Sequence, residues 1–382
     1  MVQELVQEQT SVKPKRNETS RLPLTPPATV EKKQTDENAN IAKVSPKKLL
    51  PQLKKSNRKP RLKYRPDPFS VFHLNDYLDG LDGDKDADFV RYALRHSKRI
   101  VTVAGAGISV AAGIPDFRSK TGLFKSLSGK KSTGLSSGKD LFDFNQVYSC
   151  DEMSIKFNGM ITDLHRLAQE SQSTAFHSML NEIAAEGRLQ RLYTQNIDGL
   201  DTRLTHLNTK IPLEKPAPVT IQLHGSINHV ECNMCSKIDK LDPSIFKCNS
   251  EDTTNGTQVV PTCSQCEEYE AVRMVAGLRS KGVGKLRPRV VLYNEMHPEG
   301  DLIGEITSHD IKKKPDCLIV VGTSLQIPGV KQLCKQFVQT IRARKGIVLY
   351  LNKDLPSQSV LDSIGWVDLI VLGDCQDVSK LL

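Results

Sequence analysis

Short apolar runs rich in valine, isoleucine and leucine recur along the chain from about residue 100 onward, separated by longer mixed stretches. Buried strands of a parallel sheet have this continuous apolar character, and the alternation is typical of an α/β fold with helices on both faces. We predict strands at 100–104, 190–194, 220–223, 290–293, 318–321, 347–351 and 369–372. We predict helices at 86–95 and 175–186 and after Pro328.

Small and polar residues follow six of the predicted strands. In open parallel sheets, ligands bind beyond the carboxyl ends of the strands, so these residues predict one shared cleft. In chain order the strand ends are Gly105-Ala106-Gly107-Ile108-Ser109, Gln195-Asn196-Ile197-Asp198, His224-Gly225, Gly322-Thr323-Ser324, Asn352-Lys353 and Gly373-Asp374-Cys375.

The first of these turns indicates a nucleotide. Gly105 and Gly107 let the backbone approach a pyrophosphate, and a helix starting near Ser109 would direct its N-terminal amides at the phosphates. A glycine turn that serves packing alone is the alternative interpretation. The usual hydride-transfer fingerprint has a third glycine where Val110 stands, so we expect a nucleotide-binding protein that differs from ordinary dehydrogenases.

The net charge of +9 is concentrated in the first 65 residues, which hold 16 Lys and Arg against 6 Asp and Glu. That segment carries +10 and the remainder about −1. It is also poor in aromatic residues, so we expect a disordered basic tail. Its basic runs are typical of a nuclear-import address or an arm that attracts nucleic acid, and a solvated tail without a partner is the alternative.

Cysteine spacing predicts a structural metal. No apolar run reaches the 18 residues of a membrane span, so we expect a soluble intracellular chain whose cysteines are thiols and metal ligands. Cys232, Cys235, Cys263 and Cys266 form two Cys-x-x-Cys pairs 27 residues apart, which suits a closed tetrahedral Zn²⁺ site. Cys248 is the rival ligand, and we expect Cys150, Cys317 and Cys334 to be buried thiols.

Taken together and in this order, the motifs resemble those of the sirtuins over roughly residues 70–380. The motifs that carry the resemblance are Gly105-Ala106-Gly107-Ile108-Ser109, Gly113-Ile114-Pro115-Asp116-Phe117-Arg118-Ser119, Thr194-Gln195-Asn196-Ile197-Asp198, His224-Gly225, the paired Cys-x-x-Cys and Gly322-Thr323-Ser324. The basic tail and the long stretch 204–218 are similar to the fungal nuclear branch that deacetylates histone H3.

The resemblance implies a Rossmann-like parallel-sheet domain that binds NAD, a smaller zinc-binding domain and an acyl-lysine tunnel between them. We expect a tail at 1–65 and a catalytic domain at 66–382. Within it the NAD-binding part would comprise about 90–125, 175–225 and 288–382, the zinc module about 226–285, and a helical and cofactor-loop part about 126–174.

The resemblance also assigns roles to single residues. His224 is the expected general base toward a ribose hydroxyl, with Asn196 as a second catalytic residue, and the products would be lysine, nicotinamide and acetyl-ADP-ribose. Tyr293, Asn294, Glu295, Gly329 and Val330 would flank the acetylated peptide. The expected NAD-binding residues are Gly105, Ala106, Gly107, Ile108, Ser109, Gly113, Ile114, Pro115, Asp116, Phe117, Arg118, Gln195, Asn196, Ile197, Asp198, Gly322, Thr323, Ser324, Asn352, Lys353 and Cys375.

Two positions depart from the family pattern. The usual Phe-Gly-Glu appears as Tyr293-Asn294-Glu295, and the usual His after Asn-Ile-Asp-Gly-Leu is Asp201. The expected partners are acetylated lysines of histones or other nuclear proteins, with weak nucleic-acid contact through the tail, a nuclear location and no membrane. Two alternatives stay open: an NAD-dependent protein ADP-ribosyltransferase, and a non-catalytic zinc-bearing chromatin scaffold.

Overall fold

Seven parallel strands form one sheet in the order β1-β10-β9-β8-β2-β3-β4. The computed structural model describes residues 60–81, 83–116, 140–246 and 260–382. The strands are β1 (Ser70–His73), β2 (Ile100–Ala104), β3 (Leu189–Thr194), β4 (Thr220–Gln222), β8 (Cys317–Val321), β9 (Ile347–Asn352) and β10 (Leu369–Leu372). Since all seven run in one direction, their carboxyl ends share one edge, as the predicted cleft requires.

Alternate residues of each central strand enter two different cores. In β8, Cys317, Ile319 and Val321 belong to one core, whereas Leu318 and Val320 belong to the other. Successive side chains of a strand point to opposite faces, so a sheet covered on both sides needs apolar residues at every position. This explains the unbroken apolar runs in the sequence and confirms the predicted α/β class.

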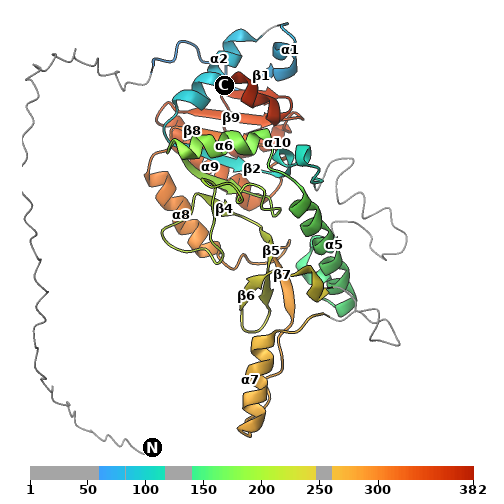
Figure 1. The fold of residues 1–382 in the computed structure, drawn as a ribbon. Coiled ribbons are helices and arrows are strands. Elements are labelled where there is room, and N and C mark those ends of the chain that lie inside the picture. The colour runs from blue at the N-terminus through green and yellow to red at the C-terminus, as the bar shows by residue number, and fades with distance from the viewer. Residues whose placement is uncertain (1–59, 82, 117–139, 247–259) are drawn as a thin grey trace, which may run out of the picture. The chain divides into compact units, whose positions relative to one another are not determined.

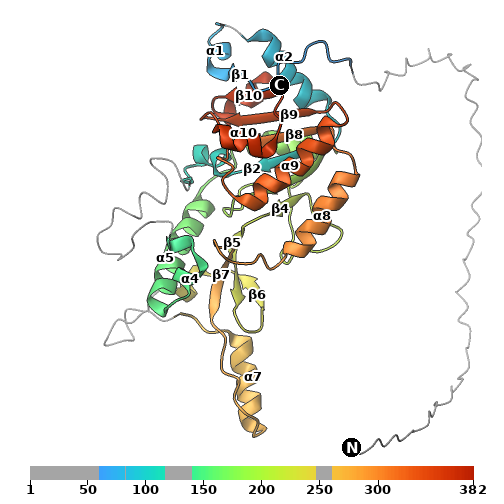
Figure 2. The same ribbon diagram turned by 180° about the vertical axis from the view of Figure 1, so that it is seen from behind.

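Helices cover both faces of this sheet. The first core contains residues of α2 (Asp84–His96), α6 (Ala175–Ala185) and the terminal 3₁₀ helix η5 (Cys375–Leu381), and α6 lies in front of the sheet in Figure 1. The second core contains residues of α8 (Gly300–Lys312), α9 (Pro328–Arg342) and α10 (Gln358–Ile364), and Figure 2 shows α9 and α10 from their own side. The short α1 (Leu74–Leu78) follows β1.

A second, antiparallel sheet has the order β6-β5-β7. Its strands are β5 (Gly225–Cys232), β6 (Ile238–Lys240) and β7 (Leu286–Val290), and α7 (Ser264–Val275) lies between β6 and β7 in the chain. A third apolar core joins this sheet to α5 (Asp151–Glu170), with Phe157 and Ile161 packed beside Ile227 and Val230. Shorter elements here are η3 (Asp140–Phe142), α4 (Phe144–Val147) and η4 (Pro243–Phe246).

The predicted strand at 290–293 was wrong. The strand β7 ends at Val290 and pairs antiparallel with β5 in the small sheet, while Tyr293 forms only an isolated bridge with Asp143. The edge strand β1 was not predicted, because only Phe72 of its four residues is buried and the segment lacks an apolar run. Within the described residues, no helix is both long and apolar enough to span a membrane.

Candidate functional site

The turn after β2 packs directly against the turn after β8. The Gly107 amide donates to the Gly322 carbonyl at 2.8 Å, and the Gly105 amide donates to the Val321 carbonyl at 3.0 Å. A Cβ on Gly107 would lie 2.6 Å from the Cα of Gly322, so no larger residue fits there without displacing backbone. The two strand ends therefore form one continuous floor of backbone atoms.

The expected α-helix near Ser109 is absent. The chain instead makes two short 3₁₀ turns, η1 (Ala106–Ile108) and η2 (Val110–Ala112), and Gly113 ends the second with a φ of 85°. The prediction of a helix N-terminus aimed at phosphates was thus wrong. The Ser109 amide itself donates to the Ala106 carbonyl at 2.9 Å within the first of these turns.

Gln195 connects three strand ends. Its amide side chain donates to the Thr323 hydroxyl at 3.0 Å, and its backbone carbonyl lies 3.0 Å from Nδ1 of His224. A carbonyl oxygen only accepts hydrogen bonds, so Nδ1 of His224 carries the proton. The neutral ring then has its lone pair on Nε2, the form that a general base needs.

Asn196 lies beside Ser109 at the first turn. Its Nδ2 donates to the Ser109 hydroxyl at 3.2 Å, and its own amide donates to the Thr194 hydroxyl at 3.1 Å. The side chain is 2% exposed, and its Oδ1 has no hydrogen-bond partner in the structure. Leaving a buried carbonyl oxygen unbonded costs about 1–3 kcal/mol, so this atom indicates a missing donor, such as a ligand hydroxyl.

His224 stands where the chain passes from the large sheet to the small one. It follows β4, and its carbonyl accepts from the Val291 amide at 3.0 Å, just beyond β7. The next residue, Gly225, has a φ of 77°, and a Cβ there would lie 2.2 Å from the Arg289 carbonyl oxygen. Only glycine allows the change of direction that sets the imidazole at this junction.

Two buried carboxyl groups follow Asn196 in the chain. Asp198 is 4% exposed and accepts from the Leu200 amide at 2.9 Å, and Asp201 is fully buried and accepts from the Thr202 amide at 2.8 Å. Burial raises the pKa of Asp198, opposed by its hydrogen bonds from Leu200 and Ser109. Burial and then the neighbouring charge of Asp198 raise the pKa of Asp201 to about 7.

The last two strands complete the edge of the cleft. The Lys353 ammonium pairs with the Asp374 carboxylate at 3.0 Å, joining the turns after β9 and β10. The Cys375 thiol lies 3.7 Å from the Gly107 carbonyl, and burial raises its pKa to about 12. Cys375 is therefore a neutral packing group against the glycine turn.

One polar residue that supports the glycine turn was not predicted. Gln376 donates from Nε2 to the Ile108 carbonyl at 3.0 Å and accepts at Oε1 from the Phe176 amide at 2.9 Å. It ties η1 to the start of α6. The only sequence signal for Gln376 was its position directly after Gly373-Asp374-Cys375.

The four predicted zinc ligands lie together in the small sheet and at the start of α7. Their Sγ atoms all lie within 4.8 Å of one another. Cys232 and Cys266 are 3.7 Å apart, as are Cys235 and Cys263. Burial opposes ionisation of Cys232, but the backbone amides of Cys235 and Met234 lower its pKa to about 7. Four convergent thiols fit a closed Zn²⁺ site without an open position for chemistry.

The expected peptide-flanking residues lie in two separate places. Tyr293 lies two residues after Val291, whose amide donates to the His224 carbonyl. The backbone of Tyr293 forms hydrogen bonds with the backbone of Phe142 and Phe144 at 2.8 and 3.0 Å. Glu295 forms an ion pair with Arg287, whose guanidinium lies 5.1 Å from the Tyr148 ring centroid.

Gly329 and Val330 begin α9 instead, and the Val330 side chain is 4% exposed within the second core. Val330 thus packs under the sheet and does not line an open groove with its side chain.

Several predictions fall outside the described residues: residues 1–59 of the tail, Phe117, Arg118 and Cys248. Residues 60–65 are described, and for them the expected disorder was wrong, because Arg65 pairs with Asp368 and Leu62 packs against the first core. Ile114 lies at the end of the described turn and packs in the third core beside Ile197. Among the remaining thiols, Cys317 and Cys334 are buried as expected, but Cys150 is exposed, so that prediction was wrong. It precedes α5 and is followed by the polar first turn of that helix, where no apolar surface covers it.

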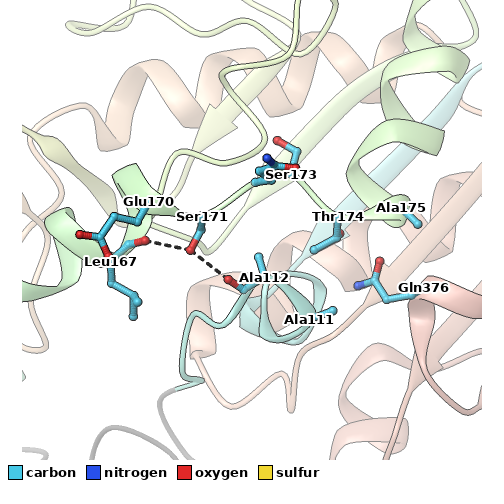
Figure 3. A pocket seen from close by; sticks show the side chains of 10 residues that line it. Ala111, Ala112, Leu167, Glu170, Ser171, Ser173, Thr174, Ala175 and Gln376 are labelled. Atoms are coloured by element: carbon cyan, nitrogen blue, oxygen red, sulfur yellow. Dashed lines mark hydrogen bonds between the residues drawn. The ribbon is translucent and has the colours of Figure 1, made fainter.

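A hollow of about 690 Å³ lies beside η2, between that turn, the α5–α6 connection and Gln376 (Figure 3). The Ser171 hydroxyl lies 2.9 Å from the Ala112 carbonyl and 2.8 Å from the Leu167 carbonyl, and its single hydrogen can be donated to either one. Neither His224 nor Asn196 lines this hollow, so it adjoins the candidate site without containing the catalytic candidates.

Comparison with known proteins decides the family. A model of the Sir2 family matches residues 105–329, which hold the glycine turn, Asn196, His224 and all four clustered cysteines. The chain belongs to the Sir2 family. The expectation from the sequence motifs is thereby confirmed.

Several fungal Sir2 proteins resemble the chain over most of its length. The chain is 58% identical to the NAD-dependent histone deacetylase HST4 of Saccharomyces cerevisiae, over 94% of this chain and 98% of that protein. It is 46% identical to the NAD-dependent protein deacetylase hst4 of Schizosaccharomyces pombe, over 74% and 66% of the two chains. These matches support the predicted fungal histone deacetylase branch.

Solved Sir2 structures share the fold. A crystal structure of a Sir2 homologue in complex with NAD has a TM-score of 0.56 at 20% identity, over 83% of this chain and 95% of that one. This likeness confirms the Rossmann-like sheet with its smaller second domain.

Proposed function

We propose that this chain is an NAD-dependent protein-lysine deacetylase of histones, which transfers the acetyl group to ADP-ribose with release of nicotinamide. The observation that carries the proposal is the hydrogen bond from Nδ1 of His224 to the Gln195 carbonyl at 3.0 Å, at the junction of the two sheets. Fungal relatives with the names NAD-dependent histone deacetylase and NAD-dependent protein deacetylase support the reaction and the substrate class.

The strand-end residues fit NAD. The buried Oδ1 of Asn196 lacks a donor that a ribose hydroxyl would supply, and the glycine floor at Gly107 and Gly322 lets phosphates approach backbone atoms. When bound, NAD supplies an electrophilic ribose carbon and nicotinamide as leaving group. Thr323, Lys353 and Cys375 lie at the neighbouring strand ends and would bind the remainder of the dinucleotide.

His224 is the proposed general base. With Nδ1 held by Gln195, the Nε2 lone pair would accept the proton of a ribose hydroxyl of bound NAD and so activate that hydroxyl toward the acyl group. Positioned general bases contribute about 10²–10⁴-fold to rate. Asn196, fixed by Ser109, would orient the same sugar.

The zinc ligands, the peptide-flanking residues and the tail would have roles outside the proton transfer itself. The four clustered cysteines would bind one Zn²⁺ that holds β5 and α7 together, away from the chemistry. Tyr293, Asn294 and Glu295 would border the acetylated peptide beside His224. The basic tail at 1–65 would direct the protein to the nucleus and contribute weak nucleic-acid contact.

A peptide assay tests the proposal. The full chain is incubated with an acetylated histone H3 peptide and NAD, and we expect one nicotinamide and one deacetylated lysine per turnover. His224→Ala should lower kcat at least 10²-fold with zinc content and melting temperature unchanged. His206→Ala, at an exposed histidine, is the matched control and should retain full activity.

Two results would contradict the proposal. Transfer of label from NAD to protein without deacetylation would indicate an ADP-ribosyltransferase. A zinc-loaded chain that releases no nicotinamide with any of a panel of acetylated histone peptides would indicate a non-catalytic scaffold.

A further inference from the structure

The edge of the large sheet opposite the proposed NAD site collects positive charge. Three adjacent strands begin there, because Ile100 of β2 is in register with Cys317 of β8, and Cys317 with Ile347 of β9. Adjacent strands lie about 4.8 Å apart, so the three starting points fall within about 10 Å. The segments before these strands are 98–99, 312–314 and 344–345, and every residue in them is an exposed lysine or arginine. We call these seven residues the basic edge.

Hydrogen bonds join the three segments into one surface. The Asp316 amide donates to the Arg99 carbonyl at 3.1 Å, and the Ile347 amide donates to the Asp316 carbonyl at 3.0 Å. Asp316 thus links the start of β2 to the start of β9. The basic edge is therefore a single patch drawn from residues far apart in the sequence.

Little negative charge opposes this patch. The Asp316 carboxylate accepts from the backbone amides of Lys98 and Arg99 at 2.8–3.1 Å, so it is directed at the chain. Asp368 is buried and paired with Arg65. None of the seven cations makes an ion pair with another residue of the described part of the chain. The body has a net charge of about −1, so this concentration is local.

Helix-end stabilisation does not account for so many cations. The helices α8 and α9 end at this edge, where a basic residue in the last turn complements the helix dipole, and Lys312 and Arg342 already occupy those turns. Lys314 and Lys345 lie just beyond the helices with φ of 60° and 58°, a conformation that favours glycine. The chain thus carries lysine at two positions where glycine would be less strained.

We infer that the basic edge binds the phosphate backbone of duplex DNA. Lysine and arginine patches without base-reading geometry bind nucleic acid through phosphates. The inference rests on the proposed function, since a nucleosomal histone substrate presents DNA beside the acetylated lysine. An acidic membrane is the less suitable partner, because stable anchoring there needs a second signal besides basic residues, such as inserted apolar side chains, and none of the seven residues is apolar.

A four-site variant tests the inference in the full chain. Lys98→Ala, Lys313→Ala, Lys314→Gly and Lys345→Gly remove four cations, and the two glycines suit the backbone there. The matched control removes four exposed cations elsewhere, by Lys240→Ala, Arg279→Ala, Lys281→Ala and Lys335→Ala. Binding to a 20-base-pair duplex is measured by fluorescence anisotropy from 50 to 200 mM salt.

We expect the basic-edge variant to bind the duplex at least about tenfold more weakly. The slope of the logarithm of the association constant against the logarithm of the salt concentration should become shallower by about 0.9 for each phosphate contact removed. The control should change far less. The variant should melt no lower than wild type and should deacetylate free acetylated peptide at the wild-type rate, while its KM for acetylated nucleosomes rises.

The outcomes distinguish the proposed deacetylase function from the proposed binding of DNA at the basic edge. If wild type fails to deacetylate the peptide, the proposed function fails, whatever the DNA result. If wild type is active but both four-site variants bind the duplex equally, the tail supplies the affinity and the inference is wrong. Variant-sensitive binding to phosphatidylserine vesicles without variant-sensitive binding to the duplex would also overturn it.

Discussion

Arg191 and Asp310 form a buried bidentate ion pair between β3 and α8. Arg191 donates to the two carboxylate oxygens at 2.6 and 2.9 Å, and the two side chains are 5% and 0% exposed. The Tyr193 hydroxyl donates to the same carboxylate at 2.9 Å, and Arg191 also donates to the Pro218 carbonyl. The pair therefore holds the end of the long segment 204–218 against the strand that leads to Asn196.

Removing the cation should be costly, because a buried carboxylate would remain without its counter-charge. We expect Arg191→Met to lower the free energy of unfolding by about 3–5 kcal/mol. Arg166→Ala breaks the exposed pair with Glu170 and should cost less than about 1 kcal/mol. Urea denaturation of both variants checks this, and equal losses would show that burial of the Arg191 pair is unimportant.

The contact between Gly107 and Gly322 predicts that no residue larger than glycine is tolerated at position 107. In Gly107→Ala the new methyl group would meet the Cα of Gly322 at 2.6 Å, so we expect a loss of about 1–3 kcal/mol and weaker NAD binding. Gly304→Ala on the exposed side of α8 meets no atom within 4 Å and should stabilise the helix by up to about 1 kcal/mol. Calorimetric titration with NAD and thermal unfolding measure the two effects. Wild-type NAD affinity in Gly107→Ala would contradict the proposed role of this turn.

The cysteine cluster predicts one tightly bound zinc per chain. Cys232→Ser removes one of four ligands, so we expect loss of the metal and a fall in Tm of about 5–10 °C, since metal binding and folding of the module are coupled. Cys150→Ser, at an exposed thiol outside the cluster, should change neither quantity. Atomic absorption and thermal melting provide the measurements. Full zinc content in Cys232→Ser would exclude this ligand set.

The raised pKa of Asp201 predicts that the free energy of unfolding depends on pH. Its pKa of about 7 in the folded chain lies above the ordinary 3.8, so between about pH 4 and 7 the folded state holds a proton that the unfolded state has lost. Folding stability from this group is therefore highest at low pH and falls as pH rises toward 7. Asp201→Asn cannot ionise, so its stability relative to wild type should grow by about 3 kcal/mol between pH 5 and pH 8.

The control for this titration is Asp163→Asn on the exposed side of α5, whose difference from wild type should stay constant over the same pH range. A constant difference for Asp201→Asn as well would mean that Asp201 is ionised in the fold.

Several strands and the cysteine cluster could be predicted from the sequence because they are encoded locally. The continuous apolar runs at β2 and β10 predicted both strands with their observed ends, since a strand covered on both faces needs apolar residues at each position. The spacing of Cys232 and Cys235 fixed a metal knuckle for a similar reason, because both ligands come from one turn of the chain.

Other features depended on packing between distant segments. The resemblance implied a helical part at about 126–174, but the bounds of α5 were not predicted, because its buried face includes Asn158 and His165 along with apolar residues, and only the third core makes that face an interior one. The segment 290–293 has a strand-like composition, but pairing with β5 ends β7 at Val290.

By itself, then, the sequence determined which polar residues follow the strands and that parallel strands bring them to one edge, because residue type and short-range periodicity encode both. The tertiary structure alone decided that Gly107 meets Gly322, that Gln195 orients His224, and that Lys98, Lys313 and Lys345 share the opposite edge. These contacts join residues far apart in the chain, and only the order of strands in the sheet brings such residues together.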